Sequence, residues 1–135
     1  MYQTPMVTND DRLWGMLAHI LGAAGMLLSV ATLQWAGPLV VWLYKRDSST
    51  FAAFHGLQSL LFQLAWFAIF WVVGIVLFII SVMTLGLGFF IMVPIMFALS
   101  LVPLIWSVVA GLKANAGEWY EYPVVGPYAR RSLGI

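Results

Sequence analysis

Residues 48–112 read SSTFAAFHGLQSLLFQLAWFAIFWVVGIVLFIISVMTLGLGFFIMVPIMFALSLVPLIWSVVAGL and contain no Asp, Glu, Lys or Arg. One crossing of the hydrocarbon core of a bilayer takes about 20 apolar residues in a helix, so this stretch is long enough for two crossings. Its main turn signal is the segment from Thr84 to Gly88, which holds two glycines. The stretch therefore predicts two membrane helices, at about residues 50–85 and 89–113.

A second uncharged stretch, residues 13–44, comes before the first. It predicts a helix at about residues 12–33, a turn from Gln34 to Pro38, and a short apolar segment at 35–45. Even counted from Leu33, the short segment would be only about 18 Å long as a helix, against a hydrocarbon core of about 30 Å. It either crosses with a partly extended start or forms a hairpin with the preceding helix that dips into the membrane and returns.

These segments predict an all-α integral membrane protein, a four-segment helical bundle whose second segment is short or half-spanning. The expected organisation is an N-terminal tail at residues 1–9, a single transmembrane domain at 10–116, and a C-terminal tail at 117–135. We expect the lipid bilayer to be its first partner.

The composition excludes several classes of protein. Of all residues, 63% are hydrophobic and 8% are charged, whereas soluble domains carry about 25% charged residues. A net charge of +1 provides no field for binding nucleic acid, and the absence of cysteine excludes disulfides and thiolate metal sites. Because no catalytic or metal-ligand spacing stands out, we expect no enzyme activity and no required cofactor or metal.

Basic residues predict the orientation, because cytoplasmic ends of membrane helices are enriched in Lys and Arg. With an even number of crossings, all six fall on one side: Arg12, Lys45, Arg46, Lys113, Arg130 and Arg131. The connections near Gln34 and Gly86 carry no charge. We therefore expect a multi-pass protein of the inner cell membrane with both termini in the cytoplasm.

The first helix has small residues at spacings of three and four, namely Gly15, Ala18, Gly22 and Gly25. In lipid, such a face lets another helix approach closely, which gives packing contacts that hydrophobicity does not supply. The favoured interpretation is packing within the chain, and the alternative is a dimer interface.

A polar face on the third segment holds His55 and Gln58, with Gln63 at its edge. Polar side chains on an uncharged membrane helix must face protein or water, because lipid offers them no hydrogen bonds. His19 of the first helix lies at a similar depth, so these four residues form a candidate intramembrane site. The favoured interpretation is structural hydrogen bonding; a proton or substrate path and a haem held by His19 and His55 are the alternatives.

Four blocks of sequence carry a resemblance: DRLWGMLAH at 11–19, GPLVVWLYKRD at 37–47, HG at 55–56 with FQ at 62–63, and KANAGEWYEYP at 113–123. They resemble a bacterial family of small four-helix membrane proteins of unknown function that is related to the Tic-twenty subunit of the chloroplast inner-envelope protein translocon. The residues that carry the motif are Trp14, Gly37, Pro38, Gly56, Lys113, Asn115, Gly117, Tyr122 and Pro123.

The third block departs from the family pattern. Members follow the His-Gly pair with a basic residue and Glu, and place Asn before Phe-Gln, whereas this chain has Leu57, Gln58 and Leu61 there. The loss of the charged pair makes an ion or proton function less plausible. The resemblance implies the fold and the membrane location but says little about activity.

The sequence therefore favours a non-enzymatic, multi-pass membrane protein that acts as a small subunit or accessory of a larger membrane assembly. Its expected partner is another membrane protein or a further copy of the chain. The alternative is a small transporter or oligomeric pore component with a polar path through His55, Gln58 and Gln63.

Overall fold

The computed structural model describes residues 6–135 and contains five helices in that part of the chain. They are α1 (Asn9–Leu28), α2 (Ala36–Lys45), α3 (Thr50–Met83), α4 (Phe89–Asn115) and α5 (Val125–Ser132). The all-helical class predicted from the sequence is confirmed. The first four helices correspond to the four predicted segments, and α5 was not predicted.

The helix ends follow local sequence signals. Thr8 caps α1 in a capping box with Asp11, and the Ser49 side chain caps α3 by accepting from the backbone N–H of Ala52. α1 ends at Leu28, before the predicted residue 33, because Val30 and Ala31 adopt positive φ angles of 50° and 60°. That conformation cannot continue a right-handed helix, so the chain turns there.

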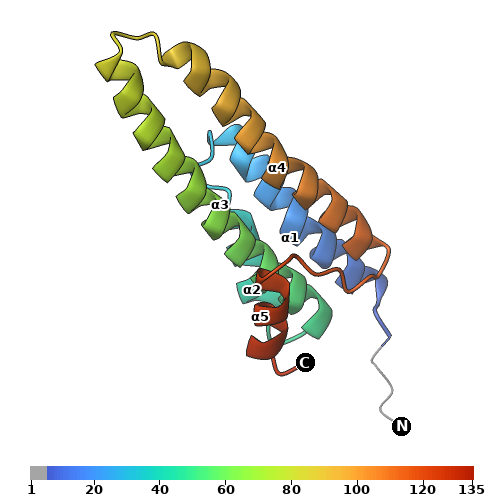
Figure 1. The fold of residues 1–135 in the computed structure, drawn as a ribbon. Coiled ribbons are helices and arrows are strands. Elements are labelled where there is room, and N and C mark those ends of the chain that lie inside the picture. Colours follow the sequence, from blue (N-terminus) through green and yellow to red (C-terminus); the bar gives the residue numbers. More distant parts are fainter. Residues whose placement is uncertain (1–5) are drawn as a thin grey trace.

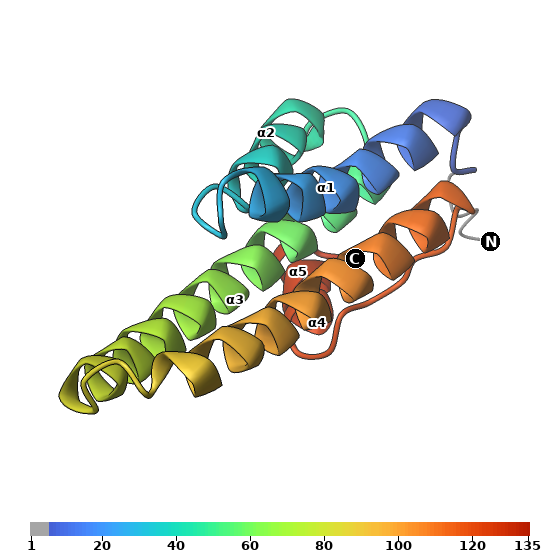
Figure 2. The same cartoon turned by 90° about the horizontal axis from the view of Figure 1, so that it is seen from above.

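The long helices α3 and α4 lie side by side as an antiparallel hairpin, and α1 and α2 cover only one part of its length (Figures 1 and 2). At 1.5 Å per residue, α3 is about 51 Å long and α4 about 40 Å, whereas α2 is about 15 Å. α3 and α4 are the two helices of the described chain that are long and apolar enough to cross a membrane. α2 is too short to cross, so the α1–α2 hairpin ends part-way along the α3–α4 hairpin (Figure 1).

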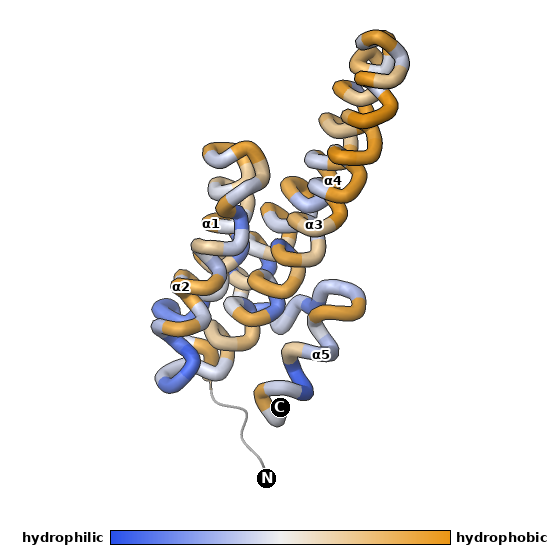
Figure 3. Tube along the Cα trace, turned by 90° about the vertical axis from the view of Figure 1, so that its left-hand side faces the viewer, coloured by the Kyte–Doolittle hydropathy of each residue, from blue (hydrophilic) through white to orange (hydrophobic). Residues whose placement is uncertain are grey.

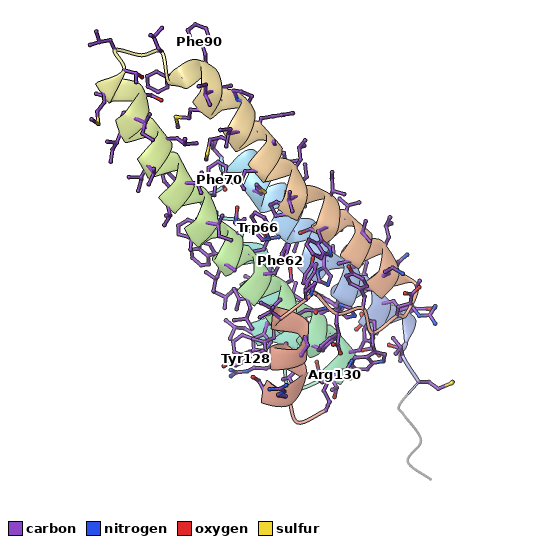
Figure 4. All side chains as sticks on the ribbon, viewed as in Figure 1. Phe62, Trp66, Phe70, Phe90, Tyr128 and Arg130 are labelled. Carbon is purple, nitrogen blue, oxygen red and sulfur yellow. The ribbon has the colours of Figure 1, made fainter. Side chains whose placement is uncertain are left out.

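The part of the α3–α4 hairpin that extends beyond α1 is almost wholly apolar on its surface (Figure 3). Exposed side chains there include Val72 on α3 and Phe90 and Val93 on α4, and Phe90 lies near the hairpin tip (Figure 4). An apolar surface of this extent is unfavourable in water and is typical of helices that face lipid.

The predicted C-terminal tail folds back onto the helices. α5 packs against the N-terminal half of α3 (Figure 1). Tyr122 and Ala129 are fully buried. Residues 117–135 are therefore part of the folded body. The packing of this segment could not be predicted from hydropathy, because the side chains that hold it are polar groups buried inside the helices.

Candidate functional site

Four polar side chains meet inside the helices: His19 of α1, His55 and Gln58 of α3, and Tyr122 of the segment between α4 and α5. We call them the histidine cluster. Each of the four has an exposed fraction of 0%. A buried polar side chain without a partner is costly, so the partners of these four groups define what the cluster can do.

The cluster forms a continuous chain of hydrogen bonds. The Tyr122 hydroxyl lies 2.9 Å from Nδ1 of His19, and Nε2 of His19 lies 2.9 Å from Nδ1 of His55. Nε2 of His55 lies 3.1 Å from the backbone carbonyl oxygen of Glu118. The chain thus runs from the C-terminal segment through α1 and α3 and back to the C-terminal segment.

The direction of this chain follows from its end at Glu118. A carbonyl oxygen only accepts, so Nε2 of His55 carries the proton and Nδ1 of the neutral ring accepts. His19 must then donate from Nε2 and accept at Nδ1, and the Tyr122 hydroxyl donates to it. With both rings neutral, every ring nitrogen in the chain has a complementary partner.

Gln58 forms two hydrogen bonds to the backbone of the C-terminal segment. Its Nε2 donates to the carbonyl oxygen of Tyr120 at 2.8 Å, and its Oε1 accepts from the N–H of Tyr122 at 3.2 Å. The same Nε2 lies 3.2 Å from Nδ1 of His55. Because both backbone bonds fix the orientation of the amide, two N–H groups converge on the lone pair of His55 Nδ1.

Tyr122 is the largest fully buried side chain in the described chain. Its ring stacks on Phe62 of α3 with a centroid distance of 4.0 Å, and Phe62 lies within the α3–α4 hairpin (Figure 4). Burial raises the pKa of the Tyr122 phenol, so the hydroxyl stays protonated and can donate to His19.

Gln63 does not join the histidine cluster. Its Nε2 donates to the Ser107 hydroxyl of α4 at 2.9 Å, and its backbone carbonyl accepts from Nε2 of Gln34 at 2.9 Å. Gln34 and Gln63 are both fully buried, and Oε1 of each has no hydrogen-bond partner. The four predicted site residues therefore fall into two groups, one around His55 and one around Gln63.

The small face of α1 lies against the rest of this chain. A Cβ at Gly15 would lie 2.8 Å from the Phe51 ring, and one at Gly22 would lie 2.6 Å from Nε2 of Gln63. A Cβ at Gly25 would meet the backbone of the turn that leads to α2, and the carbonyl of Ala18 accepts from the Ser59 hydroxyl. The face is thus occupied by contacts within the chain.

Several motif residues mark close approaches between helices or turns. A Cβ at Gly56 would lie 2.9 Å from the backbone of Trp42, and one at Gly37 would lie 2.5 Å from Cβ of Leu21. Gly117 has a φ of +83°, which favours glycine after α4. The remaining motif residues lie as follows: Pro38 is buried in α2, Trp14 packs on Tyr44, Lys113 pairs with Glu118 at 2.9 Å, and Asn115 and Pro123 are exposed.

The spacing of the two rings bears on the haem alternative. An imidazole nitrogen binds a metal ion at about 2 Å, so two nitrogens on opposite sides of an iron lie about 4 Å apart, with the macrocycle between the rings. His19 Nε2 and His55 Nδ1 are 2.9 Å apart, and their rings meet edge to face at 80°. This geometry fits a direct hydrogen bond and leaves no room for a macrocycle.

Two crevices of about 290 Å³ each lie beside Phe70 of α3 and Met96 of α4. One is closed on its other side by Met26, Leu27, Val30 and Ala31 at the end of α1, and the other lies between α3 and α4 alone. Ser100 is the one polar residue among their lining, and its hydroxyl donates to the carbonyl of Phe97. Neither crevice reaches the histidine cluster.

Three residues of the buried hydrogen-bond groups were not predicted from the sequence. Tyr122 was visible only as a motif residue, and Gln34 and Ser107 lie in stretches read as a turn and as an apolar helix. Tyr122 stands in a Trp-Tyr-Glu-Tyr-Pro run that resembles an interfacial aromatic belt, so nothing in the spacing indicated a buried hydrogen bond.

Comparisons with known proteins give two matches. Residues 10–129 match the model of the magnetosome magnetite crystal formation protein family. A UPF0132 membrane protein from Archaeoglobus fulgidus is 31% identical over 121 residues, which cover 88% of this chain and 98% of the relative. No solved structure matches the chain.

Proposed function

Because the chain belongs to the magnetosome magnetite crystal formation protein family, and matches an archaeal membrane protein over nearly its whole length, we propose that it is a non-enzymatic subunit of a membrane assembly. The family description refers to magnetosome magnetite crystal formation, and the archaeal relative is named a membrane protein. The four sequence blocks resemble a bacterial family that is related to the Tic-twenty subunit of a protein translocon, and this relation supports an assembly role by analogy alone.

One observation carries the proposal: the polar side chains of the histidine cluster are bonded to one another and to this chain's own backbone. Their bonds end at the carbonyls of Glu118 and Tyr120 and the N–H of Tyr122. A catalytic or transport group must instead face a substrate or a water-filled path. Ser100 is the one polar residue that lines the two crevices beside Phe70 and Met96, and such an apolar lining suits lipid or a helix of a partner.

In this proposal, α3 and α4 cross the membrane and the α1–α2 hairpin enters from the charged side. The lengths of the helices and the apolar surface of the distal hairpin support this arrangement. The polar pairs Lys45–Asp10 and Lys113–Glu118 then lie in the cytoplasm, together with α5. Both termini are cytoplasmic.

Cysteine labelling tests this orientation, since the chain has no native cysteine. Single cysteines at Ser48, Leu87 and Ser132 are expected to react with an impermeant thiol reagent in intact cells only at position 87, the tip of the α3–α4 hairpin. A further position, Gln3, is expected to stay unlabelled and lies outside the described residues. Labelling of position 132 from outside contradicts the orientation.

Detergent-free affinity purification with mass spectrometry tests the assembly role. We expect a membrane-protein partner, or a second copy of the chain, to be recovered in a fixed ratio. Val72→Trp, which enlarges the exposed face of α3, is expected to reduce recovery, whereas Val124→Trp at the opposite end is the matched control. Recovery of the chain alone, at single-copy mass, contradicts the proposal.

A second candidate function rests on a different observation. The Oε1 atoms of Gln34 and Gln63 are buried acceptors without donors, which is unusual in a dry interior. In an oligomer, these amides together with Gln58 and His55 would line a polar path of a small transporter or pore. Four short helices enclose little water alone, so this function requires several copies.

A further inference from the structure

The C-terminal strap, residues 118–135, is attached to the helices through the histidine cluster. It follows Gly117 and contains α5. His55 and Gln58 bond to its backbone at Glu118, Tyr120 and Tyr122, and the Tyr122 hydroxyl bonds to His19. Trp106 of α4 adds one bond, from its indole N–H to the Tyr120 hydroxyl at 2.7 Å.

The strap also contains a residue in an unfavourable backbone conformation. Val124, directly before α5, has a φ of 69°, which β-branched residues rarely adopt. α5 has no side-chain cap at this end. Release of the strap would let Val124 relax, so the closed state depends on the bonds that hold Tyr120 and Tyr122.

The closed state requires a particular protonation state. Two N–H groups, from His19 and Gln58, point at Nδ1 of His55. A proton on that atom removes the acceptor of the Gln58 N–H and reverses the bond to His19, which must then donate from Nδ1 to the Tyr122 hydroxyl. A proton on Nδ1 of His19 forces the Tyr122 hydroxyl to reverse from donor to acceptor. The closed strap is therefore complete only when both rings are neutral.

None of the charged side chains around the two rings bonds to a ring nitrogen. Neither ring has a carboxylate among its hydrogen-bond partners, and a positive ring would be buried without a counter-ion. The surrounding titratable groups and their contacts are Asp11 of α1 on Ser49, Arg12 of α1 beside Gly117, Lys45 of α2 on Asp10, Lys113 of α4 on Glu118, Tyr120 on Trp106, and Arg130 of α5 on Glu121.

We infer that the C-terminal strap is an acid-released element, held closed by the neutral His19–His55 pair and opened when the pair takes up protons. Once the strap leaves, the rings meet water and titrate as imidazoles do, near pH 6.5. The open state then binds protons that the closed state does not, so acid favours opening and the closed state is complete at pH 7.5. The inference does not depend on the assembly proposed above.

The expected size follows from the number of rings that titrate. Between pH 7.5 and pH 5.5, the population of the open state rises roughly 10-fold if one ring takes up a proton on opening and roughly 100-fold if both do. Opening separates α5 from α3, so it exposes the buried position Ala129.

Thiol labelling of two single-cysteine proteins in bilayer nanodiscs measures this opening. Ala129→Cys reports the open state, and Tyr128→Cys, at an exposed position on the same helix, reports the reagent's own dependence on pH. The ratio of the two rates is expected to rise by roughly 10- to 100-fold from pH 7.5 to pH 5.5. An unchanged ratio overturns the inference.

Two variants assign the titrating groups. Glu121→Gln removes the carboxylate that pairs with Arg130 and is expected to keep the rise; loss of the rise in this variant would attribute opening to that ion pair and overturn the inference. His19→Gln/His55→Gln cannot titrate and is expected to give the same ratio at both pH values. A rise in this double variant also overturns the inference.

Discussion

Replacing His55 by leucine is expected to lower the free energy of unfolding in detergent by about 2–6 kcal/mol, because two buried or partly buried polar groups lose their partner at about 1–3 kcal/mol each. The groups are the Glu118 carbonyl and Nε2 of His19. The Gln58 amide loses a third contact. Thermal unfolding followed by loss of helical signal measures the change.

His55→Gln is the matched control. An amide keeps one donor and one acceptor, so it can retain part of the chain between His19 and Glu118, but it cannot carry an added proton. We expect this variant to fold, to be modestly less stable than the wild type, and to keep any assembly intact. Equal stability of His55→Leu and the wild type would show that the bonds of the ring do not stabilise the fold.

Replacing Gly22 by leucine is expected to destabilise the protein by about 1–3 kcal/mol through overpacking. Already the Cβ would lie 2.6 Å from Nε2 of Gln63 and 3.1 Å from its Cδ. Gln63 has little freedom to move away, since its amide bonds to Ser107 and its carbonyl bonds to Gln34. The larger side chain must push α1 away from α3.

Ala24→Leu is the control for this substitution, because Ala24 lies on another side of α1 and is only partly buried. It adds a similar volume without meeting Gln63 and is expected to be tolerated. Comparison of expression level and thermal stability in detergent separates the two variants. Equal values for both would mean that the Gly22 face does not hold helices together.

The sequence predicted the helices well because their signals are local. The uncharged run from residue 48 to 112 and the glycines near Gly86 place α3 and α4 within a few residues of their observed ends. The end of α1 was placed five residues too late, at 33. Apolar residues continue past Leu28, and hydropathy does not register the positive φ angles of Val30 and Ala31.

The candidate site was predicted in part. His19 and His55 were placed at a similar depth by counting residues from the start of each helix. In the structure, Nε2 of His19 lies 2.9 Å from Nδ1 of His55. Their azimuths, and hence the hydrogen bond, depend on how α1 crosses α3, which no local pattern specifies. Gln63 shares the helix with His55 but bonds toward α4 and Gln34.

The C-terminal segment shows the largest difference between the sequence prediction and the structure. Residues 117–135 are polar and aromatic, so composition favoured a solvated tail. The segment folds back because Gln58 supplies an acceptor and a donor to its backbone. The Tyr122 ring also packs against His19 of α1, Phe62 of α3 and Trp106 of α4. Hydrogen bonds between residues so far apart in the sequence cannot be predicted from the periodicity of apolar residues.

In the function proposed here, the histidine cluster is a structural element that holds the C-terminal strap and is not a proton path. Proton flux into proteoliposomes under a pH gradient tests it most directly, with wild type and folded His55→Gln measured beside protein-free vesicles. We expect flux no greater than that of empty vesicles for both proteins, because the hydrogen-bond chain ends at the backbone carbonyl of Glu118, which cannot pass a proton on. Flux in the wild type that disappears in His55→Gln would contradict it.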